Sequence, residues 1–496
     1  MEEPDLEKDS IINNRFIIKR KIGEGSFSKV YLILDEEDKE KYAAKILLEK
    51  KAQKETSSFE NEIAILKKLK LKPKIVKYVN QFHDSGIGDI TKKGNVIMKN
   101  RYYLITTYFS KKNLFTYLDK TQEGFEEKYI KIIFSKILEC FDYIHSKDIC
   151  HLDVKLQNIM LDEHFIPIII DFGLSHLMEK DKDNKYKPIN DKRIRGTPFY
   201  ISPQIWGRKK YSGIKADIFS LGALLFFLAT KNNSFIMANP IDDNYKLICK
   251  NNIDKFWSKL EGLYPKVKSL SPEFKDLFIK MISFKEEERP GSIRDIFSHQ
   301  WMQEVNKFTS EDYSNYEKIM KDLELKVLQD DETLESFSSK EDSNINLGSR
   351  SSGEDSDEEE FFDDKISPKL LSNTGLNAMN YLRIKGEISP EKFMNSLANK
   401  IKQELNCEIN AHDELLMFEA TFPNKIREEL ENMEKMEDEE INMEEIEFKD
   451  CVITIELFEF INGGYELNFN KGEGEFMDYY SFFQETKKIV KKILSK

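Results

Sequence analysis

The pattern of apolar and polar residues predicts a small strand-rich region followed by a larger helical one. Residues 16–48 hold three short runs with strand-like patterns, FIIKRKIG, SKVYLIL and KYAAKILL, and the charged turn DEEDKEK joins the last two. These runs predict an antiparallel meander. Apolar residues recur at helical spacing from Phe59 to Leu71, and the apolar blocks from Phe125 to Trp301 are longer and mostly helical.

Beyond residue 302 the pattern breaks and then returns. Residues 303–375 are acidic and rich in serine, so we expect a largely disordered linker, with a helix only near residues 316–329. Residues 376–496 are expected to fold again. Ser389 and Pro390 begin a helix with apolar residues every four positions, CVITIELFEFI and YELNFN predict a hairpin, and a last helix follows over residues 478–494.

Length and composition narrow the class of protein. A chain of 496 residues exceeds what one core supports, so two or three domains are expected. Residues 310–364 carry nineteen acidic and five basic side chains, whereas the whole chain has a net charge of −13, so the rest of the chain is nearly neutral. Five cysteines without paired spacing favour a reducing compartment.

Several classes of protein and site are not expected. The acidic N-terminal tail, residues 1–15, does not resemble a secretory signal, and the longest apolar run, residues 221–229, is too short to cross a membrane. The seven histidines lack metal-ligand spacing, and the basic residues are not interleaved with aromatic residues as on a nucleic-acid-binding face. We therefore expect a soluble, cytoplasmic protein with no transmembrane segment and no nucleic-acid partner.

The first candidate site begins after the first predicted strand. In GEGSFSKV, Gly23 and Gly25 let the backbone approach phosphates that a Cβ atom would obstruct. This loop lies between two strands, which fits neither a Walker A loop nor a dinucleotide-binding turn. Lys45 stands on an otherwise apolar strand, where an isolated lysine usually reaches out to solvent. Glu62 on the next predicted helix offers a counter-ion, so a buried ion pair that reaches phosphate is the better interpretation.

The second candidate site is the loop HLDVKLQN, residues 151–158. It places Asp153, Lys155 and Asn158 at a spacing that suits phosphoryl transfer from a nucleotide. Further motifs follow in the sequence: Asp171-Phe172-Gly173, GTPFYISPQ, DIFSLG and Arg289-Pro290. In this unbroken order, the whole set resembles the protein kinase family across residues 16–302. The similarity is to its calmodulin-dependent and AMP-activated-kinase group, which implies an α+β bilobal fold with a β-rich N-lobe and a helical C-lobe.

The resemblance also implies a role for each matching residue. Lys45, held by Glu62, would pair with ATP phosphates, and Asp153 would accept the proton of the substrate hydroxyl. Lys155 would steady the transferring phosphate, while Asn158 and Asp171 would hold Mg²⁺. The residues implied around ATP are Ile22, Gly23, Glu24, Gly25, Ser26, Phe27 and Ser28 in the glycine-rich loop, Val30, Ala43 and Met160 around the adenine, Thr106 as the gatekeeper, and Thr107, Tyr108 and Phe109 along the hinge.

The chain departs from the family pattern at a few positions. Ser28 replaces the third loop glycine, Ser202 and Gln204 replace the Ala and Glu of Ala-Pro-Glu, and Leu152 replaces the Arg before the catalytic Asp. Gln204 would exchange an ion pair with Arg289 for a neutral hydrogen bond, at a cost in stability more than in chemistry. Regulation is expected at Leu152, Phe172, Gly173, Thr197, Gln204 and Arg289.

Leu152 bears on how such an enzyme would be controlled. In the family, the arginine at this position clamps a phosphorylated Ser or Thr of the activation segment. Residues 176–195 contain no Ser or Thr, and carry Lys192, Arg193 and Arg195 instead. Both the arginine that would bind the phosphate and the Ser or Thr that would carry it are missing. We therefore predict activity that does not depend on phosphorylation of this segment.

Substrate preference follows from two other positions. Relatives that prefer an arginine upstream of the target carry acidic residues where this chain has Asn113 and Gln157. Amides cannot supply the ionic attraction, and Lys111 and Lys112 stand nearby, so weak or no preference for upstream arginine is predicted.

Residues 376–496 resemble the kinase-associated-1 domain at the end of AMP-activated-kinase relatives. The resemblance rests on the first helix, the paired strands and the entry GEGEFMDYYSFF into a closing helix. Opposite its apolar face this helix carries a set of lysines: Lys487, Lys488, Lys491, Lys492 and Lys496. These lysines can be merely solvated, can bind an anionic phospholipid surface, or can pair within the chain with the acidic linker or the kinase.

The sequence therefore predicts a protein serine/threonine kinase that uses ATP and Mg²⁺ and is regulated by its C-terminal domain. Lipid binding by the lysine face would add recruitment to membrane surfaces. Two other functions are weighed beside it, a pseudokinase scaffold without turnover and a lipid-recruited adaptor. The intact Lys45, Asp153 and Asp171 speak against the first, and the full motif set speaks against the second.

Overall fold

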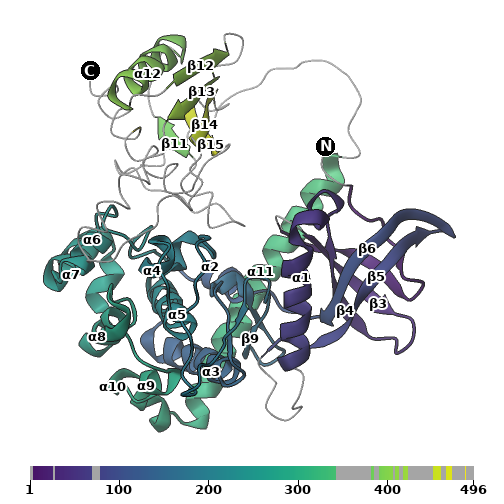
Figure 1. Cartoon of the computed structure of the whole chain (residues 1–496), viewed down its shortest axis with the longest axis horizontal. Coiled ribbons are helices and arrows are strands. Elements are labelled where there is room, and N and C mark those ends of the chain that lie inside the picture. Colours follow the sequence, from purple (N-terminus) through teal and green to yellow (C-terminus); the bar gives the residue numbers. More distant parts are fainter. Residues whose placement is uncertain are drawn as a thin grey trace, which may run out of the picture. The chain divides into compact units, whose positions relative to one another are not determined.

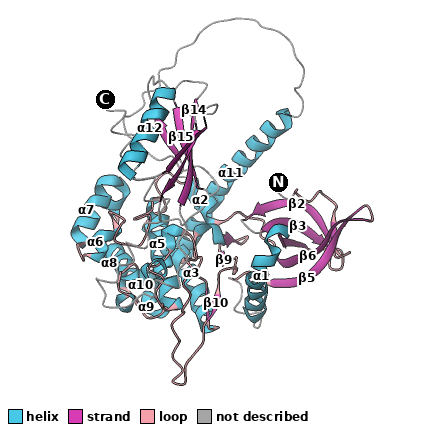
Figure 2. Cartoon of the chain, turned by 45° about the horizontal axis from the view of Figure 1, so that its top comes forward, coloured by secondary structure: helices cyan, strands magenta, loops and turns pink. Residues whose placement is uncertain are grey.

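The computed structural model describes residues 4–25, 28–69, 79–341, 381–384, 390–405, 408–412, 417–422, 451–459, 465–471 and 486. The chain divides into two compact units, Met1–Asn346 and Leu347–Lys496. The first unit contains a strand-rich lobe and a helical lobe, in the order that the sequence pattern predicts (Figures 1 and 2).

The small lobe is a closed antiparallel barrel with the strand order β1-β2-β3-β4-β6-β5. Its strands are β1 (Ile11–Ile12), β2 (Phe16–Glu24), β3 (Ser28–Asp35), β4 (Lys41–Leu47), β5 (Phe82–Lys92) and β6 (Asn95–Thr107). Strands β2, β3 and β4 form the predicted meander. Apolar side chains fill the barrel, among them Phe16, Ile18, Ile33, Ala44 and Ile105. Helix α1 (Glu49–Leu69) follows β4 and begins well before its predicted start.

A tail is expected over residues 1–15, but residues 4–15 of this segment are part of the small lobe. Strand β1 pairs with both β2 and β5 and so closes the barrel. Leu6 and Ile12 are buried, with 8% and 0% of their surface exposed. The Asp5 carboxylate accepts hydrogen bonds from Lys21 and Lys29, at 2.9 and 2.6 Å. Burial of apolar surface and these ion pairs together hold the segment on the barrel.

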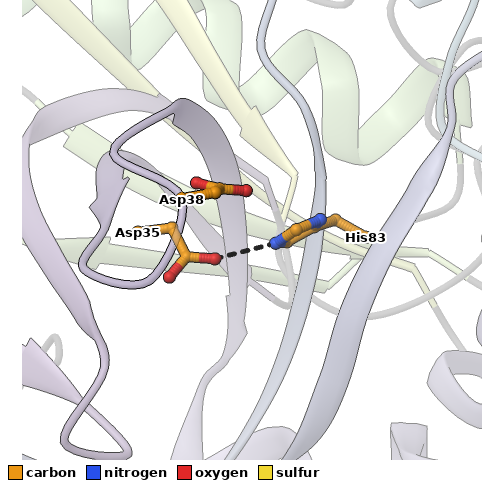
Figure 3. A group of neighbouring side chains, drawn as sticks. All are labelled: Asp35, Asp38 and His83. Atoms are coloured by element: carbon orange, nitrogen blue, oxygen red, sulfur yellow. Dashed lines mark hydrogen bonds and ion pairs between the residues drawn. The ribbon is translucent and has the colours of Figure 1, made fainter.

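The buried carboxylate of Asp35 stabilises the turn between β3 and β4. Asp35 has no exposed side-chain surface and accepts two hydrogen bonds from Arg15, at 2.8 and 2.6 Å. Figure 3 shows Asp38 and His83 beside it, with His83 Nε2 at 2.9 Å from Asp35. These three residues lie close enough to share a metal ion, but the hydrogen bonds from Arg15 hold the pKa of Asp35 well below its usual range. Because the guanidinium already neutralises this carboxylate, we assign the group to the structure of the lobe and not to metal binding.

The large lobe is mostly helical, with short strands around the loop of residues 151–158. Its helices and 3₁₀ turns are α2 (Leu114–Asp119), α3 (Glu127–Ser146), η2 (Leu156–Asn158), η3 (Pro198–Tyr200), α4 (Pro203–Trp206), α5 (Gly213–Thr230), α6 (Tyr245–Cys249), α7 (Ile253–Leu263), η4 (Pro265–Ser269), α8 (Pro272–Met281), η5 (Glu286–Glu288), α9 (Ile293–Phe297), α10 (Gln300–Gln303) and η6 (Glu304–Lys307). Its strands are β7 (Ile149–Cys150), β8 (Ile159–Leu161), β9 (Pro167–Ile169) and β10 (His176–Leu177).

Helix α5 is apolar on every side and forms the centre of this lobe. Among the described residues it is the one helix long and apolar enough to cross a membrane, and 89% of it is buried inside the protein. A helix that is apolar all round is typical of a protein core.

Helix α11 (Ser310–Glu341) occupies the first half of the segment expected as a largely disordered linker. It is longer than the helix expected near residues 316–329, and it lies beside α2 (Figures 1 and 2). Its buried side chains recur at helical spacing: Tyr316, Met320, Leu323 and Val327. The Tyr316 hydroxyl donates to the Phe165 carbonyl at 2.8 Å. The acidic composition hid an amphipathic face that packs on the large lobe.

Removal of one buried side chain of α11 should destabilise the first unit. Met320 has 0% exposed surface, so Met320→Ala should lower the free energy of unfolding by about 3 kcal/mol through lost burial and a cavity. Leu325→Ala is the matched control, because 60% of Leu325 is exposed and little should change. Urea denaturation of both variants measures the difference. Equal stability of the two variants would mean that α11 does not pack on the lobe in solution.

The second unit has a five-stranded antiparallel sheet in the order β11-β15-β14-β13-β12. Its elements are β11 (Tyr381–Ile384), α12 (Pro390–Leu405), β12 (Glu408–His412), β13 (Met417–Phe422), β14 (Cys451–Glu459) and β15 (Tyr465–Lys471). Helix α12 begins at the predicted proline and buries Phe393, Met394, Leu397 and Ile401. Strands β14 and β15 pair as predicted from their alternation.

Some predictions lie outside the described residues. These are Ser26 and Phe27 in the glycine-rich loop, the acidic residues 342–375, and the lysines of the closing helix, Lys487, Lys488, Lys491, Lys492 and Lys496.

Candidate active site

The predicted ion pair lies between the two lobes. Lys45 on β4 places its Nζ 2.8 Å from Glu62 Oε2 on α1 and 3.0 Å from Asp171 Oδ1 in the large lobe. Lys45 is half-buried and Glu62 is buried. One ammonium therefore joins β4, α1 and the Asp171 loop.

The charges of this group depend on each other. The Lys45 ammonium is the main cause that lowers the pKa of Asp171 to about 2, so Asp171 is ionised at neutral pH. Burial opposes the charge on Lys45, but the carboxylates of Asp171 and Glu62 outweigh it and raise the pKa of the lysine. Burial raises the pKa of Glu62, and Lys45 opposes that shift.

Helix α1 is also tied to the segment that follows Asp171. Ser58 Oγ donates to the Gly173 carbonyl and Asn61 Nδ2 to the Ser175 carbonyl, each at 2.8 Å. A Cβ atom at Gly173 would lie 3.3 Å from Asp171 Oδ1 and 3.6 Å from Glu62 Oε2, so a side chain there would crowd the ion pair. Phe172 is fully buried, with its ring centroid 5.1 Å from that of His151.

The loop of residues 151–158 gathers four polar side chains. Lys155 Nζ lies 2.7 Å from Asp153 Oδ2 and 3.1 Å from Thr197 Oγ1. The Thr197 hydroxyl donates to Asp153 Oδ1 at 2.8 Å. Asn158 Nδ2 donates to the Asp153 carbonyl and to its Oδ2, at 2.9 and 3.0 Å. This set can orient a hydroxyl, accept its proton and offset negative charge beside it.

The predicted nucleotide-binding residues come from both lobes. Gly23 lies near the end of β2 and pairs with Val30, and Gly25 directly follows this strand and donates its amide to the Ser28 carbonyl at 2.8 Å. A Cβ atom at either glycine would make only ordinary contacts of 3.7 Å or more with this chain, so the protein itself does not demand glycine there. Glycine there suits the close approach of a ligand from outside.

The residues expected around the adenine lie on strands of both lobes. Ala43 on β4 pairs with Thr106 on β6, and Tyr42 pairs with Thr107. Met160 lies on β8 of the large lobe, which pairs with β9. Val30 and Ala43 therefore belong to the small lobe and Met160 to the large lobe, and their contact with an adenine stays a prediction. Ile22 and Glu24 lie on β2, and Tyr108 and Phe109 follow β6 into the connection between the lobes.

Leu152 has a buried side chain and a backbone that is held by hydrogen bonds. It is buried, with 5% exposed, and lies in the left-handed region at φ 61°. Its amide and that of His151 donate to the two carboxylate oxygens of Asp217, each at 2.8 Å. His145 Nε2 lies 2.8 Å from the same carboxylate. Asp217, which has no exposed surface, therefore fixes the backbone that leads to Asp153.

Gln204 and Arg289 contact each other as predicted. Arg289 donates to Gln204 Oε1 at 2.6 Å, and Gln204 Nε2 donates to the Phe284 carbonyl at 2.8 Å. Burial lowers the pKa of Arg289. A glutamate at 204 would gain an ion pair but would turn a carboxylate toward the Phe284 carbonyl, so glutamine matches its surroundings.

The residues considered for substrate preference are engaged within the protein. Asn113 caps helix α2, where its side chain accepts hydrogen bonds from the amide and the hydroxyl of Thr116. Lys111 Nζ lies 2.7 Å from Glu324 Oε1 of α11 and above the Phe165 ring. Lys111 is therefore paired with α11, and Asn113 and Gln157 are the positions where an acidic residue is missing.

The donor set fits a magnesium ion. Asn158 uses its amide nitrogen in the bonds to Asp153, which leaves the amide oxygen as the ligand atom. Asp171 uses Oδ1 for Lys45, so Oδ2 can bind a cation. Carboxylate and amide oxygens are the protein ligands that Mg²⁺ prefers. Asn158 and Asp171 would hold the ion, which supplies neutralisation of charge on phosphate oxygens.

The match to a known family identifies the class of protein to which this chain belongs. Residues 16–302 match the protein kinase domain family, which is more than half of the chain. The chain belongs to the protein kinase family. The bilobal arrangement of mixed strands and helices is the fold of this family.

Individual relatives are all protein kinases by name. The CBL-interacting serine/threonine-protein kinase 13 of Arabidopsis thaliana is 29% identical over 298 residues, 59% of this chain and 52% of the relative. A probable cell cycle serine/threonine-protein kinase CDC5 homolog of Encephalitozoon cuniculi is 28% identical over 307 residues, 61% of this chain and 58% of the relative. The kinase pakH of Dictyostelium discoideum is 30% identical over 243 residues, 49% of this chain and 43% of the relative. The chain spans about half the length of the curated relatives it matches.

Sequence reasoning missed several residues of the kinase site. Ser58 and Asn61 share helix α1 with Glu62. Ser58 lies one helical turn before Glu62, and this spacing could have suggested a polar contact near the ion pair. Asp217 stands in the motif DIFSLG, but its bonds to His145, His151 and Leu152 join residues far apart in sequence.

Proposed function

We propose that this kinase transfers the γ-phosphate of Mg-ATP to serine or threonine of protein substrates. The arrangement that carries the proposal is the Asp153 carboxylate, which faces Lys155 and Thr197 at hydrogen-bond distance. Asp153 would orient the substrate hydroxyl and accept its proton. Lys155 would offset charge on the transferring phosphate, and Lys45 would position the other phosphates.

The intact ion pairs favour turnover over a scaffold role. A nucleotide-binding scaffold needs neither a base in the loop nor a lysine held by both Glu62 and Asp171. This kinase has both: Lys45 contacts Glu62 and Asp171, and Asp153 pairs with Lys155 in the loop. Incubation with Mg-ATP and a generic protein substrate, followed by mass spectrometry of the phosphorylated side chains, tests the proposal. We expect phosphoserine and phosphothreonine, and product confined to tyrosine would contradict the specificity.

We further propose that activity does not require phosphorylation of the activation segment. Leu152 is buried and cannot bind a phosphate, and residues 176–195 carry no Ser or Thr. Protein made in a host without upstream kinases should therefore be as active as protein made in a host that has them, and treatment with a phosphatase should leave the rate unchanged. Loss of activity after phosphatase, with a mock-treated sample as control, would refute this.

Because Leu152 cannot bind a phosphate, the activity needs a form of control other than phosphorylation of the activation segment. We propose that the unit of residues 347–496 restrains the kinase. Its sheet and helix α12 form a unit of their own, and the resemblance to a kinase-associated-1 domain supports a regulatory role. We also propose a cytoplasmic location, with binding to anionic lipid through the lysines of the closing helix.

A further inference from the structure

The activation segment contains a hairpin held by its own backbone. Strand β10 pairs with β7, and beyond it Lys180 forms an antiparallel bridge with Tyr186. The Lys187 amide donates to the Glu179 carbonyl at 2.9 Å, and the Asp181 amide donates to the Lys185 carbonyl at 2.8 Å. Figure 2 draws this segment after β10 as loop. Lys180 and Tyr186 therefore lie opposite each other on the two strands of the hairpin.

Both of these side chains reach one carboxylate outside the segment. Asp148 lies between the end of α3 and the start of β7, just before the loop that carries Asp153. Lys180 Nζ and the Tyr186 hydroxyl lie 2.7 and 2.8 Å from Asp148 Oδ1. The Met178 amide donates to the Asp148 carbonyl at 2.7 Å. Side chain and backbone of Asp148 thus hold the segment at three points.

The same carboxylate also faces helix α1. Lys68 Nζ near the end of α1 lies 3.9 Å from Asp148 Oδ2. Hydrogen bonding to Lys180 is the largest cause that lowers the pKa of Asp148, which keeps this carboxylate charged at neutral pH. Asp148 lies at φ 60°, a left-handed conformation that Asp and Asn tolerate better than other residues.

The basic residues farther along the segment are occupied locally. Arg193 and Arg195 both pair with Asp191, at 3.0 and 2.5 Å. Leu152 offers no charge to this segment. Among the described residues, Asp148 is the one carboxylate outside residues 176–195 that pairs with a lysine or arginine of this segment.

We propose that Asp148 is a positioning residue that anchors the activation segment in place of a phosphate clamp. The charges are the reverse of those in the family, where an arginine of the large lobe binds a phosphate of the segment. Here the large lobe supplies the anion, Asp148, and the segment supplies the cation, Lys180. The proposal rests on the proposed kinase function. The charges of this anchor belong to unmodified side chains, so it forms without a modifying enzyme and is always present.

A double-mutant cycle on the full chain tests the anchor. Asp148→Asn keeps the backbone conformation and an acceptor for Tyr186 but removes the charge, and Lys180→Gln removes the partner. Each should lower kcat/KM for a protein substrate about tenfold, with KM for ATP changed less than about twofold, because the loss lies at the segment and not at the nucleotide. The double variant should be no worse than either single one.

A second readout does not depend on activity. Hydrogen exchange, followed by mass spectrometry, should be faster over residues 176–195 in both single variants than in the wild type. Asp142→Asn is the control, since this exposed carboxylate of α3 pairs with Arg294 only at 3.6 Å. Unchanged exchange in Asp148→Asn, or losses that multiply in the double variant, would overturn the anchor. A wild type without transfer activity would refute the proposed function, and exchange alone would then decide the anchor.

Discussion

Replacement of Asp153 with asparagine should lower kcat by about a thousandfold, because the asparagine amide cannot accept the proton of the substrate hydroxyl. Asp153 is buried and lies within hydrogen-bond distance of Lys155, Thr197 and Asn158. Asparagine has nearly the same shape and can still accept a hydrogen bond from Lys155, so the loop should keep its conformation. KM for ATP should change little, since Asp153 acts at the hydroxyl and not at the nucleotide.

Steady-state rates with varied ATP and varied protein substrate separate these quantities. Asp142→Asn is a matched control on the surface of α3 and should retain the wild-type rate. An Asp153→Asn variant with more than a tenth of the wild-type kcat would exclude Asp153 as the base.

Replacement of Asp217 with alanine should give the largest loss of stability, about 3–5 kcal/mol in the free energy of unfolding. The change leaves the buried amides of His151 and Leu152 without their acceptor. It also releases the backbone of Leu152, which is held at φ 61°. Both effects act on the loop that carries Asp153, so activity should fall together with stability.

Thermal and urea denaturation measure this effect against Asp276→Ala. Asp276 is an exposed carboxylate on α8 that pairs with Lys280 and His299, and its loss should cost less than about 1 kcal/mol. If the two variants unfold alike, the Asp217 hydrogen bonds contribute no more than a surface ion pair.

The sequence predicts the site well because each part is carried by a short motif. Gly23, Lys45, Asp153, Asn158 and Asp171 stand in motifs whose order alone identifies the family. Strands β2, β3 and β4 are recognisable as short apolar runs bounded by a glycine-containing loop and a charged turn, although β3 is buried at most of its positions and not only at alternate ones. The Lys45–Glu62 pair could be proposed because Lys45 stands on an otherwise apolar strand and Glu62 on the next predicted helix offers a counter-ion.

Other parts depend on contacts that no local pattern reveals. The first turns of α1, EKKAQKETSS, have no apolar repeat, so the helix seemed to begin only at Phe59. Strand β1 has two residues, and its place is set by pairing with β2 and β5. The acidic composition of α11 outweighed its apolar repeat of Tyr316, Met320, Leu323 and Val327. In each case tertiary packing overrode the local signal.

Asp148 shows the same limit at the level of function. In the sequence it is one carboxylate in the connection SKDIC, with nothing to mark it. Its partners Lys180 and Tyr186 belong to a hairpin whose bridge is visible only in the folded chain. The leucine at position 152 raises the question of what holds the activation segment, and the contacts of Asp148 that bear on it are present only in the folded chain.

Phosphate transfer from Mg-ATP to a protein substrate tests the central claim most directly. We would compare the full chain, a chain that ends at residue 345 and so keeps α11, and Asp171→Asn, which removes the charge that binds Lys45 and the metal. We expect turnover by both wild-type chains, a faster rate for the shorter one if residues 347–496 restrain it, and no turnover by Asp171→Asn. Binding of ATP without turnover by either wild-type chain would contradict the assignment as an active kinase.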